Sequence, residues 1–288
     1  MSSLNTLALA GALALAASAA TAADLAYAPP PAEPPVLKGT ISSGFYLRGD
    51  IGVGVQTVGK YRQEDVEEIG GVLFNKTDQT AFFGGIGAGY RFNNWFRVDV
   101  TGEYRGAGTI GVNDKLFNPY ANGTQTNTYR GNLSSMVALF NAYVDLGTWN
   151  CLTPYLGVGI GVAQNRITGL TEQGIVWSNQ ASGGPISPTL GTSASGSSTG
   201  LAWALMAGVG YEVNKNLTLE IGYRYLNLGE ARSGPISNAF LPQSYRPLKA
   251  KDIDSHDIKI GMRWNFGDPD CCGPVQQPIA YAPVVRKY

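Results

Sequence analysis

The stretch FRVDVTGEYR, residues 96–105, alternates strictly between two kinds of side chain. One parity holds Arg97, Asp99, Thr101, Glu103 and Arg105, and the other holds Phe96, Val98, Val100, Gly102 and Tyr104. Because successive side chains of a β-strand point to opposite faces, this pattern predicts a strand with one charged face and one apolar face. The fold therefore depends on which surroundings suit such a strand.

The composition of the chain narrows the choice. Its 288 residues include 38 glycines, and 15% of the residues are charged. Glycine at about twice its usual share, with so few charges, argues against a helical enzyme. Lysine plus arginine and aspartate plus glutamate number 21 each, so no basic surplus is available to bind phosphates. Nucleic acid is therefore not expected as a partner.

Alternation recurs along the chain. The segments that show it are 45–56, 81–93, 95–105, 135–147, 155–164, 201–213, 217–228 and 255–266. Each is longer than the roughly five or six residues of a common strand and matches the ~9 to 11 residues that cross a bilayer with a tilt. The connections alternate between long and short, as in transmembrane barrels with short periplasmic turns and long external loops. We predict an all-β fold, an eight-stranded antiparallel up-and-down transmembrane β-barrel.

The parity that faces away from lipid carries the charges of these segments. Its basic residues are Arg48, Arg91, Arg97, Arg105, Arg224, Lys259 and Arg263, and its acidic residues are Asp50, Asp99, Glu103, Asp145, Glu212, Glu220 and Asp257. A desolvated ion in a narrow barrel needs an opposite partner or costs several kcal/mol. Seven charges of each sign therefore predict an interior neutralised by one-to-one ion pairs, with inward glycines leaving room for long side chains.

Aromatic residues occur where a membrane–water interface is expected. The predicted belt at the short turns comprises Phe92, Trp95, Trp149, Trp264 and Phe266. Trp203 is expected at the opposite interface. His256, the sole histidine, has outward parity and lies near the long-loop end, without the partners that base catalysis requires. We expect no enzyme activity, no metal and no cofactor.

The two ends of the chain differ from the barrel. Residues 1–22 resemble a signal peptide, with an apolar run and a small-x-small site that predicts cleavage between Ala22 and Ala23. The segment lacks a basic residue before the apolar run, and a membrane helix is the alternative, although the run is shorter than the ~20 residues that span a bilayer. Residues 23–43 are a Pro-rich periplasmic linker, 44–266 the barrel and 267–288 a Pro-rich periplasmic tail.

Three cysteines map to the expected periplasmic side, which is oxidising. We expect Cys151 to form a disulfide with either Cys271 or Cys272. A vicinal bridge between Cys271 and Cys272, or a disulfide to another protein, is the alternative.

Several stretches resemble small eight-stranded outer-membrane barrel proteins of the OmpA-like and opacity-like group, and most of all alphaproteobacterial porin-family members. The stretches are GFYLRGDIGVG, FFGGIGAGYRFNNWFRVDVTGEYR, NAYVDLGTWNCLTPYLGVGIGVA, LTLEIGYRYLNLG and HDIKIGMRWNF, which together extend over residues 44–266. The resemblance implies a bacterial outer-membrane location and a final aromatic residue, Phe266, that the barrel-assembly machinery reads. The tail after Phe266 departs from this pattern.

We therefore expect a structural outer-membrane protein that contributes to envelope integrity and displays four extracellular loops. Its partners are the outer-membrane lipids, the barrel-assembly machinery and, through the loops, a host or surface ligand. The first loop holds an acidic cluster from Glu64 to Glu68, the third is Ser/Gly-rich and flexible, and the fourth carries Tyr245 and Arg246 among prolines. A surface adhesin and a small porin-like channel are the alternatives.

Overall fold

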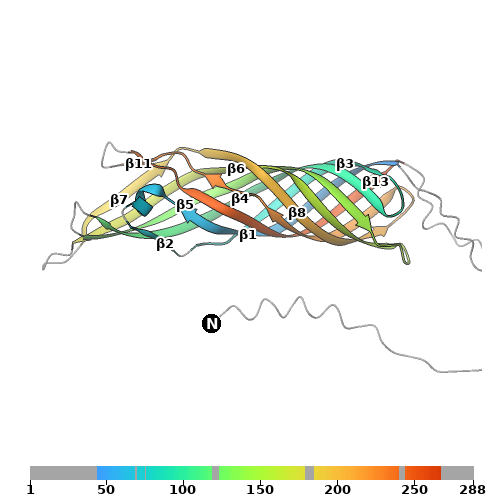
Figure 1. Cartoon of the computed structure of the whole chain (residues 1–288), viewed down its shortest axis with the longest axis horizontal. Helices are drawn as coiled ribbons and strands as arrows, with labels where there is room; N and C mark the ends of the chain where they lie inside the picture. Colours follow the sequence, from blue (N-terminus) through green and yellow to red (C-terminus); the bar gives the residue numbers. More distant parts are fainter. Residues whose placement is uncertain are drawn as a thin grey trace, which may run out of the picture. The chain divides into compact units, whose positions relative to one another are not determined.

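The computed structural model describes residues 44–68, 70–74, 76–118, 123–178, 185–239 and 244–266. Eight long antiparallel strands form a closed ring in the order β1-β3-β4-β5-β6-β8-β9-β13, with β13 pairing back onto β1 (Figure 1). Their bounds are β1 Gly44–Arg62, β3 Gln79–Arg91, β4 Phe96–Asn118, β5 Gly123–Asp145, β6 Leu152–Ser178, β8 Gly196–Glu212, β9 Leu217–Asn227 and β13 Lys249–Asn265. The prediction of an eight-stranded barrel is confirmed.

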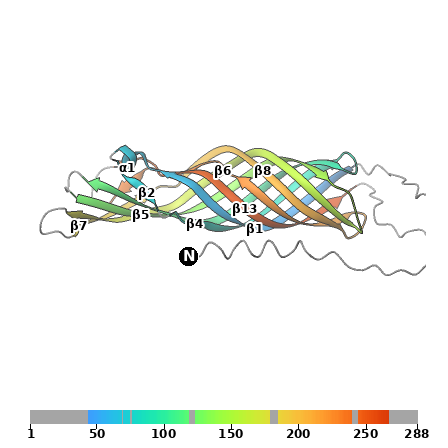
Figure 2. The ribbon, with the colours of Figure 1, turned by 60° about the horizontal axis from the view of Figure 1, so that its bottom comes forward.

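Short elements gather at one end of the barrel, which we call the loop end. They are α1 Glu64–Glu68, β2 Val72–Phe74, β7 Pro185–Ser193, β10 Ala231–Arg232, β11 Ile236–Asn238 and β12 Ser244–Tyr245. Figure 2 shows α1, β2 and β7 together at this end. β2 pairs with β4, β7 with β6 and β11 with β7. These short strands therefore extend the sheet beyond the eight strands of the ring.

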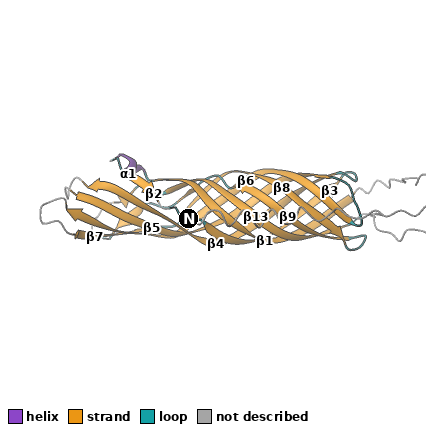
Figure 3. Ribbon diagram, turned by 90° about the horizontal axis from the view of Figure 1, so that it is seen from below, coloured by secondary structure: helices purple, strands orange, loops and turns teal. Residues whose placement is uncertain are grey.

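The expectations of long external loops and of a flexible third connection are wrong for much of the length of these segments. β4, β5 and β6 run for 23, 23 and 27 residues, well beyond the segments that alternation predicts. Most of the Ser/Gly-rich third connection is strand, in the last part of β6, β7 and the start of β8. In Figure 3 the strands, drawn in orange, extend to the loop end of the barrel.

The opposite end, which we call the turn end, has three short turns with local causes. Asn93 Oδ1 accepts hydrogen bonds from the backbone N–H groups of Trp95 and Phe96, at 3.0 and 2.8 Å. Asn214 repeats the arrangement with Asn216 and Leu217. The third turn places Asn150 and Cys151 at φ 49° and 65°, the left-handed backbone of tight hairpins that twist with their strands.

Candidate functional site

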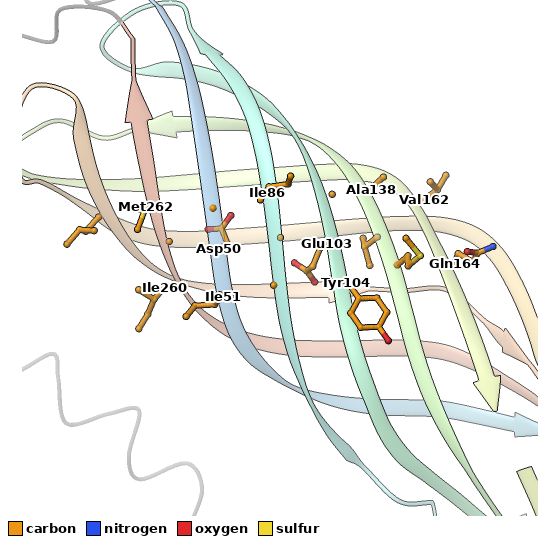
Figure 4. A pocket seen from close by; sticks show the side chains of 18 of the residues that line it. Asp50, Ile51, Ile86, Glu103, Tyr104, Ala138, Val162, Gln164, Ile260 and Met262 are labelled. Carbon is orange, nitrogen blue, oxygen red and sulfur yellow. The ribbon is translucent and has the colours of Figure 1, made fainter. Parts of the chain in front are cut away.

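The outer wall of the ring is apolar in a continuous band. Phe82 and Ile86 are each 75% exposed, and comparable side chains follow on every strand of the ring. Figure 4 shows the alternation, with Ile51 next to Asp50 on β1 and Tyr104 next to Glu103 on β4. The wall is hollowed here because the outward glycines 49, 84 and 102 alternate with large apolar neighbours. A soluble monomer rarely exposes so large an apolar surface, so this band faces hydrocarbon.

The interior of the turn-end half holds a network of eight charged side chains. It contains four cations and four carboxylates, which are Arg48, Arg97, Lys259, Arg263, Asp50, Asp99, Asp145 and Glu220. Arg48 contacts Asp50, Asp99 and Glu220 at 2.8, 2.9 and 3.2 Å. Glu220 also lies 3.5 Å from Arg97 and 3.4 Å from Arg263. The charges neutralise one another as a network, whereas the sequence suggested separate pairs.

A second, smaller network lies further toward the loop end. Arg105 contacts Asp257 at 2.7 Å and Glu103 at 2.9 Å, and Arg224 contacts the same two carboxylates at 2.8 and 2.7 Å. These two cations and two carboxylates are again balanced. The remaining inward charges, Arg91 and Glu212, lie near the turn end, where Arg91 is buried and Glu212 half-buried.

Inward aromatic rings pack against the guanidinium groups. The Arg97 guanidinium lies over the rings of Tyr143 and Tyr155, 4.2 and 4.9 Å from their centroids. Arg105 and Arg224 lie over the ring of Phe83, at 4.6 and 4.9 Å. These rings stabilise cations away from water. The sequence analysis did not single them out, although they share the parity of the charged residues.

The loop-end half of the interior holds an apolar core, which the alternation of the sequence does not predict. Ile110, Leu133, Ile167, Leu226 and Ile253 are each at most 1% exposed and belong to one hydrophobic core. Among the charged residues below this core, the structure shows a cavity of about 10 Å³. That volume is close to the minimum that holds one water molecule.

Aromatic rings frame the apolar band at both ends. At the turn end Phe92, Trp95, Trp149, Trp264 and Phe266 are all exposed, as their predicted place in a belt requires. At the other end the Trp203 and Tyr225 rings lie 5.2 Å apart between centroids and are tilted by 49°, and the Tyr223 hydroxyl lies 2.6 Å from Nδ1 of the exposed His256. From Trp264 to His256 the strand runs for roughly 27 Å, which at a tilt of about 40° corresponds to roughly 20 Å across the membrane, comparable with the ~25 Å apolar band of outer-membrane barrels.

The acidic cluster of the first connection meets the fourth connection at the loop end. The backbone N–H of Arg246 donates to Asp65 at 2.7 Å, and its guanidinium contacts Glu64 and Glu68. Lys249 also contacts Glu64, and the bond from Lys249 lowers the pKa of the Glu64 carboxyl. The contacts are exposed, so they fix the position of α1 more than they stabilise the fold.

Two carboxyl groups buried at the loop end have no cationic partner among the described residues. Asp114 accepts hydrogen bonds from Asn127 and from the Tyr129 hydroxyl, at 3.0 and 2.8 Å. Glu172, 8% exposed, makes no hydrogen bond or ion pair within the described residues. Burial and, to a smaller extent, the charge of Asp114 together raise the pKa of Glu172 to about 7. The Ser/Gly-rich sequence around Glu172 predicts a flexible loop, so this buried pair was not expected.

Other predicted features rest on parts of the chain outside the described residues. Cys151 is disulfide-bonded, but Cys271 and Cys272 lie outside the described ranges, so its pairing stays a prediction. The cleavage site at Ala22 and Ala23, the linker and the tail lie outside them too. Within the described ranges, no group of three or more His, Cys, Asp or Glu residues could hold a metal ion. No helix there is long and apolar enough to span a bilayer.

A closed ring with an apolar wall and a charged interior defines an integral barrel of the outer-membrane class. The chain matches the outer membrane protein beta-barrel domain over residues 7–266 and belongs to this family. The resemblance inferred from the sequence and the outer-membrane location are thereby confirmed.

Individual relatives share much of the chain. An uncharacterized protein of Brucella abortus (strain 2308) is 34% identical over 278 residues, covering 85% of this chain and 92% of that protein. A Rickettsia bellii (strain OSU 85-389) protein named as an adhesin is 23% identical, covering 78% of this chain and 89% of that protein. The crystal structure of OprG from Pseudomonas aeruginosa aligns with 79% of this chain and 98% of its own, with a TM-score of 0.46 and 15% identity.

Proposed function

We propose that this protein is a non-conducting, non-catalytic scaffold of the outer membrane, which contributes to envelope integrity and displays a folded surface at its loop end. The observation that carries the proposal is the filled interior. Two balanced ionic networks fill the interior on the turn-end side, and an apolar core with two buried carboxyl groups, Asp114 and Glu172, fills the loop-end side. Eight strands enclose only enough space for side chains, and here the side chains use it.

The proposal includes an orientation. The three short turns and the aromatic belt belong to the periplasmic side, and the loop end faces outward, as in barrels with short periplasmic turns. Residues 1–22 then serve as the export signal, cleaved between Ala22 and Ala23, and both termini are periplasmic. The barrel-assembly machinery would read Phe266, and outer-membrane lipids would cover the apolar band.

Conductance recording tests the scaffold against the porin alternative. The full chain is purified in detergent, its folded state is verified by heat-modifiable migration in a gel, and it is inserted into planar bilayers. We expect no steady single-channel conductance under conditions in which recovered bilayer protein still migrates as folded. Steady channels from that preparation would overturn the proposal.

Surface recognition is a second candidate function, favoured by one observation. Beyond the apolar band, the loop end is built largely of paired strands, so it presents a persistent surface to a partner. The adhesin name of the Rickettsia bellii relative agrees with such a role. Binding assays with substitutions confined to the loop end test this role.

A further inference from the structure

Beyond the apolar band, one sheet face gathers the exposed apolar side chains. The loop-end sheet consists of β2, β7 and the ends of β4, β5 and β6 that extend past the band. Within the described residues, the large apolar side chains exposed beyond the band are Val72, Phe74, Phe117, Trp177 and Leu190. All of them lie on β2, β4, β6 or β7, and none lies on β1, β8, β9 or β13. An apolar set confined to one face of a soluble region marks an interaction site.

The strand register places these side chains in rows. Phe117 pairs with Thr124, which pairs with Trp177 on its other side. Directly opposed residues of neighbouring strands point to the same face, so Phe117 and Trp177 flank one threonine on the outer face. Val72 pairs with Lys115, one row closer to the membrane. The face is thus a regular array of rings, aliphatic groups and hydroxyls.

The same face carries positive charge. Lys115, Arg130 and Arg166 lie exposed on β4, β5 and β6, and none forms an ion pair within the described residues. The acidic side chains of these strand ends, Asp114 and Glu172, are buried on the inner face. The outer face therefore shows cations without anions, in contrast to α1, whose acidic side chains are paired with Arg62, Arg246 and Lys249.

We propose that the outer face of the loop-end sheet binds an acidic polysaccharide presented from outside the cell that carries the barrel. Sugar rings present C–H groups that pack on Trp177 and Phe117, while carboxylate or sulfate groups pair with Lys115 and Arg130. Trp177 lies 11 residues beyond Arg166, or roughly 36 Å of strand, so the ring row stands clear of the bilayer that holds the barrel. This inference rests on the surface-recognition role proposed above.

Dextran sulfate and uncharged dextran are suitable probes, titrated against the full chain in detergent micelles after heat-modifiable migration has verified folding. We expect dextran sulfate to bind with an affinity that falls as salt rises, and dextran not to bind. The double variant Lys115→Glu with Arg130→Glu should lose about tenfold or more in affinity. Trp177→Ala should weaken binding, whereas Trp177→Phe should retain it.

The matched control is Lys60→Glu, which makes the same kind of charge reversal at an exposed position on β1, a strand that carries none of the exposed apolar side chains of the face. Its affinity should stay within about twofold of the wild type. A loss per reversed charge with Lys60→Glu equal to that of the double variant would show attraction by net charge alone and overturn the site. Equal binding of polyglutamate would overturn the choice of a polysaccharide. If dextran sulfate does not bind and the bilayers stay silent, this inference fails while the non-conducting scaffold stands.

Discussion

At the scale of single residues, Glu220 is the carboxylate that contacts the most guanidinium groups among the described residues. Its carboxylate lies within 3.5 Å of three guanidinium groups, those of Arg48, Arg97 and Arg263. It is 4% exposed, so water cannot replace it as their partner. A buried ionic group whose partner is removed loses its compensation without regaining its hydration. The network therefore depends more on this acid than on any exposed one.

Replacement of Glu220 by glutamine should strongly destabilise the barrel. We expect Glu220→Gln to lower the free energy of unfolding by about 3 to 5 kcal/mol, measured from urea unfolding in micelles. The control is Glu230→Gln, because the Glu230 side chain is 44% exposed and lies 3.9 Å from Lys251. That change should cost less than about 1 kcal/mol. Equal midpoints for the two variants would contradict the network argument.

Glu172 illustrates the opposite case, a buried carboxyl group without a cation. The groups that face it are Asp114 from β4 and Tyr129 from β5, while its partner across β7 is Gly191. Because its pKa is raised from 4.5 to about 7, the folded protein binds more protons than the unfolded chain between these values. Stability must therefore fall as the pH rises through that window.

The variant Glu172→Gln should abolish this pH dependence. Between about pH 5 and pH 8 the wild type should lose on the order of 2 kcal/mol of unfolding free energy, and the variant should not. Urea midpoints at the two pH values provide the measurement. Gln173→Glu is the control, since position 173 is exposed and a hydrated carboxylate titrates below the window. A wild type with no slope would contradict the burial of an ionising Glu172.

At the scale of elements, the alternation of apolar and polar side chains predicted the strands only as far as the first bulge. Residues 95–105 alternate cleanly, and the register between β4 and β5 shifts after Arg105. A second shift follows Arg130 on β5, and Gly169 adopts φ 61° on β6 nearby. A bulge inserts one extra residue and exchanges the faces of everything beyond it. For this physical reason the alternation signal stopped there, although the strands continue.

Glycine inside the ring makes room for rings and charged groups. A Cβ atom at Gly208 would lie 2.5 Å from the Ile221 carbonyl oxygen and 2.6 Å from the Tyr155 hydroxyl oxygen. A Cβ atom at Gly102, on the outer wall, would have nothing within 4 Å. The two positions therefore form a matched pair in which only the direction of the side chain differs.

Replacement by alanine should destabilise the barrel at Gly208 but not at Gly102. Gly208→Ala should lower the unfolding free energy by about 1 to 3 kcal/mol through overpacking, because a backbone carbonyl cannot move aside as a flexible side chain can. Gly102→Ala should leave it nearly unchanged. Urea unfolding of both variants in the same micelles gives the comparison. A stable Gly208→Ala barrel would mean that the wall near Tyr155 is less tightly packed than the structure shows.

At the scale of the whole molecule, the sequence predicted which face meets lipid and which face meets the interior. The inward positions of Arg97, Asp257 and the other charged residues follow from parity alone. The division of the interior did not follow, because Ile110, Leu226 and Ile253 resemble ordinary strand residues until the ring closes around them. Closure depends on long-range pairing, such as β1 with β13, that a local pattern does not contain.

The two interior zones lie in series, so each blocks the lumen independently. Leu226 and Leu228 are fully buried in the apolar core, and the network around Glu220 lies on the turn-end side of that core. Substituting both leucines by alanine would open a cavity in the apolar core on the loop-end side. The ionic network on the turn-end side would stay filled. A path for ions needs both zones to open, because a low-dielectric plug and a packed ionic network each exclude hydrated ions.

The double variant Leu226→Ala with Leu228→Ala should therefore remain non-conducting in planar bilayers. It should also unfold more easily, by about 4 kcal/mol or more, since each buried leucine replaced by alanine costs about 2 to 5 kcal/mol. Heat-modifiable migration selects the folded fraction, so a silent bilayer reflects folded protein. Glu172→Gln, which leaves both zones intact, is the control for insertion. Steady conductance from the leucine variant would show that ions pass the charged zone, and the closed lumen would then depend on the apolar core alone.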